Sequence, residues 1–279
     1  MNLAQFKSEF KSNLSSLYPD EEIDEIFFRL AEHHLQKSKA ETVLHYNEPL
    51  DKEQILLLQK SSARLQQGVP IQYVVGTIDF AGCVLNACEG VLIPRPETET
   101  LVHWMAQEHP QGGEVLDICT GSGCIALGFA QLTQANITGW DFSEKALDCA
   151  TTNAQRNQIA MQIHLVDVFD FPETSKSWDI IVSNPPYVLH REKSTMHTNV
   201  LDHEPHEALF VSDNDPIVFY RLITDFATTH LNHGGSLYFE LNPLTAIDVK
   251  SLLNTVGFTD IVVVNDVRGL PRMMRAKKL

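Results

Sequence analysis

A short polar turn after an apolar run is the part of this sequence whose residue types best suit chemistry. The run covers residues 178–183 and stops at Asn184-Pro185-Pro186-Tyr187. Two consecutive prolines remove two backbone N–H donors and fix two φ angles, so the turn is rigid. The first proline also keeps the residue before it out of the helical region. The turn therefore presents an amide side chain, two carbonyl groups and an aromatic face beyond the end of a strand.

This turn suits the alkylation of a planar NH2 group. The lone pair of such a nitrogen is delocalised into a carbonyl group or a ring, so the nitrogen must be held and oriented before it reacts. The side-chain oxygen of Asn184 and the carbonyl of Pro185 can accept both N–H protons and aim the nitrogen at an electrophilic methyl group. Positioning then carries most of the rate, and no dedicated strong base is required. A strand that merely ends in a rigid turn is the alternative interpretation.

Residues 116–123 form a second candidate segment, with the sequence Leu-Asp-Ile-Cys-Thr-Gly-Ser-Gly. Ligands of open α/β sheets bind beyond the carboxyl ends of the strands, where glycines let backbone N–H groups approach them. Asp141 ends the next predicted strand, and its carboxylate can accept hydrogen bonds from both ribose hydroxyls of an adenosyl group. A nicotinamide dinucleotide remains an alternative ligand, because Gly121 and Gly123 with Ala126 also fit the dinucleotide fingerprint. A tight turn without a ligand is the other alternative.

Alternating strands and helices from residue 113 onward place both segments at one edge of a sheet. The expected strands are 114–118, 137–141, 162–166, 178–183, 236–241, 261–265 and 273–277, and the expected helices are 124–132, 143–157, 216–231 and 246–256. This alternation predicts an α/β fold with a mostly parallel sheet and helices on both faces. The last two strands are joined too tightly for a parallel crossover, which predicts an antiparallel final hairpin.

The hydrophobic pattern of residues 1–70 differs from that of the rest of the chain and predicts a small all-helical domain. Apolar residues recur there at three- and four-residue steps, as in Leu3, Phe6 and Phe10, and no glycine occurs before Gly68. This region carries no catalytic constellation, so its role is structural or that of a docking domain for the substrate. Residues 71–93 alternate and are rich in β-forming residues, which predicts a β-hairpin linker before a catalytic domain over 94–279.

The composition is that of a globular chain in a reducing compartment. Hydrophobic residues make up 43% and charged residues 20%, and no apolar run approaches the roughly 18 residues of a membrane span. The N-terminus has no apolar segment of the kind that signal peptides carry. A formal net charge of −15 repels a phosphate backbone and disfavours nucleic-acid binding. The 5 cysteines, an odd number, indicate reduced thiols rather than a disulfide framework, and we expect no metal site.

The rigid turn and the glycine-containing loop together resemble those of the S-adenosylmethionine-dependent amino-methyltransferases. Further motifs narrow the resemblance to the HemK-type glutamine N5-methyltransferases, namely Gly68-x-Pro70-x-Gln72-Tyr73-x-x-Gly76, Phe80-x-Gly82, the segment 91–99, Glu204-Pro205-x-x-Ala208-Leu209 and Asp266-x-x-Gly269-x-x-Arg272. These motifs cover residues 68–276. The resemblance implies a Rossmann-like α/β methyltransferase sheet that follows a small all-helical N-terminal domain.

The resemblance implies an enzyme that methylates the side-chain nitrogen N5 of the glutamine in the Gly-Gly-Gln tripeptide of peptide chain release factors. Such an enzyme uses S-adenosylmethionine and tunes translation termination in the cytoplasm, without direct contact to nucleic acid or membranes. We expect it to be a monomer. An adenine N6-methyltransferase on DNA or RNA is the alternative, because adenine also offers a planar NH2 group, although the acidic charge argues against it. A non-catalytic cofactor-binding module is a further alternative, which the intact turn disfavours.

The resemblance also implies roles for individual residues. The catalytic residues that hold the substrate amide would be Asn184, Pro185, Pro186 and Tyr187. The cofactor-binding residues would be Cys119, Thr120, Gly121, Ser122, Gly123, Asp141, Val168 and Asn184. Two of these depart from the family pattern, because Cys119 stands where glycine is usual and Val168 where an aromatic residue is frequent. The departures bear on the fine geometry of the loop and on adenine stacking.

Overall fold

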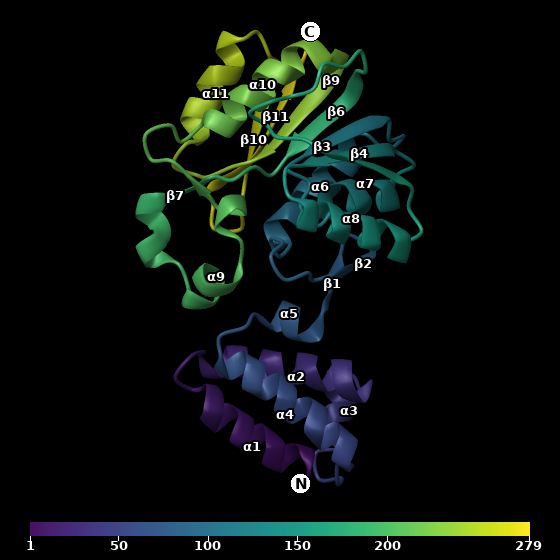
Figure 1. Ribbon diagram of the computed structural model, residues 1–279, viewed down its shortest axis with the longest axis vertical. Coiled ribbons are helices and arrows are strands. Elements are labelled where there is room, and N and C mark those ends of the chain that lie inside the picture. The colour runs from purple at the N-terminus through teal and green to yellow at the C-terminus, as the bar shows by residue number, and fades with distance from the viewer. The chain divides into compact units, whose positions relative to one another are not determined.

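The computed structural model describes residues 1–279, and the chain divides into two compact units. The first unit comprises Met1–Thr77 together with His197–His203, and the second comprises Ile78–Met196 with Glu204–Leu279. Figure 1 traces the chain through both units, from purple at the N-terminus to yellow at the C-terminus. None of the helices combines the length and the hydrophobicity that a membrane span needs.

The first unit is built from helices, as the sequence predicts. They are α1 (Leu3–Leu14), α2 (Asp20–Leu35), α3 (Lys39–Leu44), α4 (Lys52–Gln66), α5 (Ile71–Val75) and α9 (Thr198–His203). Three of them begin with a capping box at Asn2, Ser38 or Asp51, which satisfies backbone N–H groups of the first turn. The periodic apolar residues, Phe10 and Phe27 among them, share one buried cluster. Packing of these amphipathic faces therefore stabilises helices that are too short to be stable alone.

Residues 71–75 are helical, which corrects the prediction of a hairpin that begins at residue 71. Helix α5 starts after Pro70, whose fixed φ suits a helix start, and ends at Gly76, whose φ of 80° lies in the left-handed region that terminates helices. These two residues outweigh the β propensity of the apolar run between them. The two-stranded sheet is consequently shorter than predicted and consists of β1 (Thr77–Phe80) and β2 (Cys83–Asn86).

A seven-stranded sheet forms the centre of the second unit, in the order β10-β11-β9-β6-β3-β4-β5. Its strands are β3 (Glu114–Ile118), β4 (Asn136–Asp141), β5 (Met161–Leu165), β6 (Trp178–Ser183), β9 (Leu231–Glu240), β10 (Thr259–Asn265) and β11 (Pro271–Lys277). The neighbours from β5 to β9 are parallel, whereas β11 is antiparallel to both β9 and β10. This confirms the Rossmann-like α/β fold and its antiparallel final hairpin.

Helices cover both faces of this sheet (Figure 1). They are α6 (Pro96–Glu108), α7 (Cys124–Leu132), α8 (Glu144–Arg156), α10 (Val218–His230) and α11 (Ala246–Thr255). Successive side chains of a strand point to opposite faces of the sheet. Leu116 packs in a cluster with residues of α10 and α11, and Val115 packs in a cluster with residues of α6 and α7. The sheet is therefore buried on both sides, which leaves its carboxyl edge for a site.

The carboxyl ends of the central strands are in register. Ile118 pairs with Trp140 of β4 and with Ser183 of β6, and the hydroxyl of Ser183 donates a hydrogen bond of 2.6 Å to the carbonyl of Ile118. The glycine-containing loop after β3, Asp141 at the end of β4 and Asn184 after β6 therefore lie at one edge. Short elements continue the chain beyond β6, namely β7 (Val188–Leu189), the 3-10 turns η1 (His190–Thr195) and η2 (His206–Ala208), and β8 (Phe210–Val211).

One pair of cysteines departs from the prediction of reduced thiols. Cys88 and Cys149 are joined by a disulfide, with 6.2 Å between their Cα atoms, while Cys83, Cys119 and Cys124 are free. The two partners are 61 residues apart in sequence, and only the packing of α8 beside the segment after β2 brings them together. Cysteine number and spacing carry no information about such a contact.

A matched pair of leucines on α7 tests the burial of this helix. Leu127 is 0% exposed and Leu132 is 42% exposed. Leu127→Ala should lower the free energy of unfolding by about 2–5 kcal/mol, because it leaves a cavity between helix and sheet. Leu132→Ala should lower it by less than about 1 kcal/mol. Urea denaturation at equilibrium measures both values, and similar losses for the two variants would contradict the described packing.

Candidate active site

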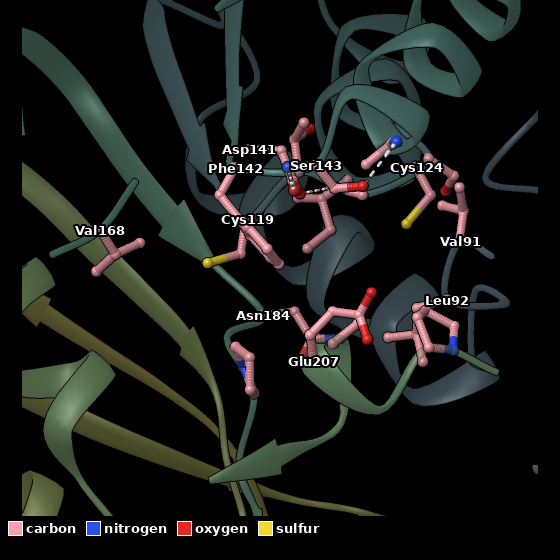
Figure 2. A pocket seen from close by; sticks show the side chains of 18 of the residues that line it. Val91, Leu92, Cys119, Cys124, Asp141, Phe142, Ser143, Val168, Asn184 and Glu207 are labelled. Atoms are coloured by element: carbon pink, nitrogen blue, oxygen red, sulfur yellow. Dashed lines mark hydrogen bonds between the residues drawn. The ribbon is translucent and has the colours of Figure 1, made fainter. Parts of the chain in front are cut away.

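A cavity of about 370 Å³ opens beyond the carboxyl ends of β3, β4, β5 and β6. Its volume is in the range that small-molecule ligands occupy. Besides the residues that follow these strands, the segment 90–95 before α6 and the segment 205–210 around η2 line it. Figure 2 shows lining side chains from several of these elements around one space. The cavity therefore has the position expected for a ligand of an open α/β sheet.

The glycine-containing loop after β3 is held from below by Asp117. This side chain is 0% exposed, and its Oδ2 accepts hydrogen bonds from the Thr120 hydroxyl at 2.7 Å and from the backbone N–H of Ala126 at 3.3 Å. Burial raises the pKa of Asp117 to about 7. Gly123 then turns the loop into α7 with a φ of 79°, and a Cβ there would lie 3.2 Å from the Ala150 side chain. Glycine is required at this point for both reasons.

Asp141 connects the loop to the start of α8. Its Oδ2 accepts a hydrogen bond of 2.8 Å from the backbone N–H of Gly121, and its Oδ1 accepts one of 3.0 Å from the backbone N–H of Ser143. The carboxyl group lines the cavity, and burial raises its pKa (Figure 2). Each oxygen still has a lone pair available for a ligand. Asp141 thus combines the support of the loop with an acceptor for hydroxyl groups.

Cys119 lines the cavity in a backbone conformation that favours glycine. Its φ is 61°, in the left-handed region that side chains with a Cβ rarely adopt. This explains why a glycine would suit the position. Burial and the nearby carboxylate of Asp141 raise the pKa of the Cys119 thiol well above its usual value. The thiol therefore stays protonated and is a poor nucleophile.

Apolar side chains form one wall of the cavity. Val168 is 7% exposed and follows β5, and Phe169 packs edge to face against Phe219 of α10, with ring centroids 5.5 Å apart. Phe142 follows Asp141 at the same side (Figure 2). A flat aromatic group such as a purine can pack against this wall. Because Val168 supplies only an aliphatic surface, the aromatic contacts here come from the phenylalanines.

The predicted rigid turn lies at the end of β6, and Asn184 and Pro186 line the cavity. The amide nitrogen of Asn184 faces the hydroxyl oxygen of Thr98 at 3.5 Å. Tyr187 turns the other way, and its hydroxyl donates a hydrogen bond of 2.9 Å to Glu240. Asn242 donates to the carbonyl of Tyr187 at 3.0 Å and closes the turn. Figure 2 shows Asn184 directed into the space below the loop.

The structure brings most of the predicted site residues to this one cavity. The predicted residues that line it are Cys119, Thr120, Gly121, Ser122, Asp141, Val168, Asn184 and Pro186. Gly123, Pro185 and Tyr187 are not part of the lining. Gly123 caps α7, and the Tyr187 hydroxyl is engaged by Glu240. Their expected roles in binding remain predictions.

The segment 205–210 around η2 contributes to the lining of the cavity and was not predicted to be part of the site. Glu204 is buried and accepts hydrogen bonds from Arg95 at 2.6 Å and from the backbone N–H of Ile93 at 3.1 Å, so it links two lining segments. Glu207, in the next turn, lines the cavity with its carboxylate (Figure 2). Arg95 and Glu204 are 109 residues apart. The only signal in the sequence was that both belong to the quoted motifs.

Comparisons with known proteins identify the family. The family model described as "Methyltransferase small domain" matches residues 96–211, and that described as "PrmC N-terminal domain" matches residues 7–76. A release factor glutamine methyltransferase of Flavobacterium psychrophilum is 37% identical to this chain and covers 99% of it, over 99% of its own length. The chain belongs to the release factor glutamine methyltransferase family. Its relative from Bacteroides thetaiotaomicron is 42% identical over 77% of this chain and 78% of its own.

A solved structure supports the fold independently. The 16S rRNA N2 G1207 methyltransferase of T. thermophilus, solved with AdoMet and guanosine, aligns with a TM-score of 0.56 over 73% of this chain and 50% of that chain. At 18% sequence identity this likeness shows the shared fold alone. Membership of the release factor glutamine methyltransferase family makes this chain a methyltransferase and excludes the oxidoreductase that the glycine-containing loop left open.

The raised pKa of Asp117 predicts how the stability of the protein depends on pH. Its pKa is about 7 in the folded chain and near 3.8 when exposed, so the folded state binds more protons between these values. The free energy of unfolding should therefore fall as the pH rises from about 4 to about 7. Asp117→Asn keeps an acceptor for Thr120 and should make this fall less steep. Denaturant titrations across this pH range measure it, and an unchanged slope in the variant would contradict the assignment.

Proposed function

We propose that this chain transfers a methyl group from S-adenosylmethionine to the side-chain nitrogen N5 of the glutamine in the Gly-Gly-Gln tripeptide of a peptide chain release factor. The observation that carries the proposal is the position of Asn184, whose amide lines the same cavity as the glycine-containing loop and Asp141. A methyl donor held by the loop and an amide held by the turn would share one enclosed space. The family relationship supplies the identity of the substrate.

The residues around the cavity fit this cofactor. S-adenosylmethionine supplies a methyl group bonded to a positively charged sulfur. The carboxyl groups of Asp141, Asp167 and Glu207 line the cavity, whereas its one lining arginine, Arg95, is paired with Glu204. This excess of carboxyl groups favours a cationic ligand. Asp141 would accept hydrogen bonds from the ribose hydroxyls.

The remaining cofactor contacts follow from the walls of the cavity. A Cβ at Gly121 would meet nothing within 4 Å, so there is open space beside the backbone of the loop. Thr120, Gly121, Ser122 and, behind them, Gly123 would accommodate the methionine end of the cofactor there. Val168 would lie against the adenine, and Cys119 would contribute only its small, protonated side chain.

The turn after β6 would hold the glutamine amide by its two N–H groups. The Oδ1 atom of Asn184 and the carbonyl of Pro185 would accept one hydrogen bond each, which fixes the direction in which the nitrogen faces. Pro186 keeps these acceptors rigid, because two fixed φ angles leave the turn little freedom. Such preorganised acceptors cost no reorganisation as the new bond forms. The amide becomes acidic only during bond formation, so its proton can leave to water without a strong base.

The charge of the chain and the absence of a basic recognition segment from its sequence support a protein substrate over a nucleic acid. The formal net charge of −15 would oppose an approach of DNA or RNA to a cavity that is itself lined by carboxyl groups. We propose a cytoplasmic monomer, because the cavity lies within one unit of one chain and the substrate is a translation factor. No contact with membranes is part of the proposal.

A methyl-transfer assay with labelled S-adenosylmethionine tests the proposed function. The substrates are a purified release factor, the same factor with its tripeptide glutamine changed to alanine, and adenine-containing DNA and RNA. We expect label in the unchanged factor alone. Label in the altered factor would place the methyl group elsewhere, and label in nucleic acid would contradict the proposed substrate class.

Removal of the Asn184 amide tests the role of the turn. Asn184→Ala should lower kcat by about 10²- to 10³-fold, by analogy with the loss of one oriented polar group in other active sites. Cofactor affinity should stay nearly unchanged, because the loop and Asp141 remain. Isothermal titration measures the affinity, and single-turnover kinetics measures the chemical step. Unchanged turnover in a variant that binds the cofactor would contradict the mechanism.

The helical unit would dock the release factor, as proposed for residues 1–70. Its surface carries exposed apolar residues without partners in the unit's core, among them Leu44 at 80% and Leu56 at 66% exposure. Surfaces of this kind are common at protein interfaces. Residues 71–77 belong to the helical unit and residues 78–93 to the catalytic unit, so the chain passes from the proposed docking unit into the catalytic unit without the separate linker expected over 71–93.

Charged substitutions on the helical unit test this docking role. Leu44→Asp and Leu56→Asp should raise KM for the intact release factor, because a charge replaces apolar contact area. KM for a short Gly-Gly-Gln peptide should not change, since the peptide reaches only the cavity. Gln59→Asp, an exposed position on the same helix as Leu56, is the matched control for added charge. If KM for the intact factor is the same in the wild type and in both leucine variants, these residues do not dock the factor.

A further inference from the structure

A buried carboxyl group lies behind the rigid turn, in a place that the proposed chemistry does not use. Glu240 ends β9 and is 1% exposed. Its Oε1 accepts the hydrogen bond from Tyr187 at 2.9 Å, and its Oε2 accepts one from the Thr98 hydroxyl at 2.6 Å. A buried carboxyl group is costly unless its oxygens are paired, and here both are. Its two partners belong to the rigid turn and to the lining of the cavity, which connects Glu240 to the candidate site.

Both partners of Glu240 must point their protons at it when it is ionised. A carboxylate only accepts hydrogen bonds, and Tyr187 and Thr98 each have a single hydroxyl proton to give. Burial raises the pKa of Glu240 above its ordinary value, and these two hydrogen bonds and the positive charge of Arg272 offset only part of that rise. The carboxylate is the form that satisfies both hydroxyl groups, because a carboxylic acid would direct its own proton at one of them.

Because the Thr98 hydroxyl donates its proton to Glu240, it cannot also donate a hydrogen bond to Asn184. Thr98 lies in the first turn of α6, is 1% exposed and lines the cavity. With its proton on Glu240, its oxygen can only accept a hydrogen bond. The amide group of Asn184 must therefore present its Nδ2 to Thr98, and the 3.5 Å between these atoms leaves room for the contact to shorten when substrate binds. The Oδ1 of Asn184 is then directed away from Thr98.

We propose that Thr98 and Glu240 are positioning residues that fix the side-chain amide of Asn184 in one of its two orientations. In this orientation Oδ1 is the atom available to the substrate N–H, whereas a flipped amide would present N–H groups to an N–H donor. The inference rests on the proposed function, in which Asn184 accepts a hydrogen bond from the glutamine amide. Neither Thr98 nor Glu240 touches the reacting atoms, so both act through Asn184.

Substitutions at Thr98 separate its hydroxyl from its shape. Thr98→Val keeps the volume and removes the hydroxyl, so Asn184 loses its anchor and kcat should fall about tenfold, the equivalent of one net hydrogen bond. Thr98→Ser restores the hydroxyl and should restore most of kcat. Thr100→Val on the same helix is the matched control, because Thr100 is exposed and its hydroxyl bonds to the carbonyl of Pro96. Equal losses in the valine and serine variants at position 98 would overturn the proposal.

A double-mutant cycle distinguishes positioning from a general structural effect. In an Asn184→Ala background, Thr98→Val should cause no further loss of kcat beyond about twofold, because the group through which it acts is gone. Glu240→Gln should behave like Thr98→Val. Its amide can donate a hydrogen bond to Thr98, so the Thr98 proton becomes free and the side-chain amide of Asn184 is no longer held in one orientation. Losses that add in full would mean that Thr98 acts independently of Asn184, and the proposal would fail.

A readout without substrate separates this inference from the proposed function. The side-chain amide protons of Asn184 can be assigned by NMR as the pair of signals missing from Asn184→Ala. They should exchange slowly with solvent in the wild type and in Thr98→Ser, and faster in Thr98→Val. This result would support the positioning role even if the release factor were not methylated. Fast exchange in the wild type would overturn the role even if the factor were methylated.

Discussion

The orientation of one side-chain amide, that of Asn184, is the constraint on which the rest of the site depends. An amide presents an acceptor on one side and a donor on the other, and only the acceptor can hold a substrate N–H group. Strand β6 places Asn184 at the carboxyl edge of the sheet. The two prolines that follow Asn184 restrict the backbone and so fix the position of its side chain. The glycine-containing loop and Asp141 reach the same edge because their strands are in register with β6.

Charge within the cavity complements this geometry. Carboxyl groups line the cavity, and the chain as a whole carries a formal net charge of −15. A negatively charged cavity attracts a cationic methyl donor, while the negative charge of the whole chain repels polyanions such as nucleic acids. Asp117 accepts hydrogen bonds from the Thr120 hydroxyl and the backbone N–H of Ala126, and Glu240 accepts them from the hydroxyl groups of Thr98 and Tyr187. A buried carboxyl group thus supports each half of the site.

The parts that the sequence predicted are those encoded locally. The sequence predicted Asn184 with its prolines, and Asp141 at the end of its strand. Strand ends and rigid turns depend on residues that are consecutive in the chain. Thr98 and Glu240 were not, since they are 142 residues apart and meet only when α6 packs beside β9. The β propensity of residues 71–75 suggested a strand, whereas Pro70 and Gly76 start and end a helix there in the folded chain. No local pattern could pair Cys88 with Cys149.

In the proposed mechanism, Asn184 and Pro185 hold the glutamine amide by its N–H groups. A crystal structure of the protein with S-adenosylhomocysteine and a Gly-Gly-Gln peptide tests it most directly. We expect the glutamine side-chain nitrogen to lie about 2.9 Å from both Oδ1 of Asn184 and the carbonyl oxygen of Pro185. A glutamine whose oxygen, instead of its nitrogen, faces Asn184, or one bound away from this turn, would contradict it.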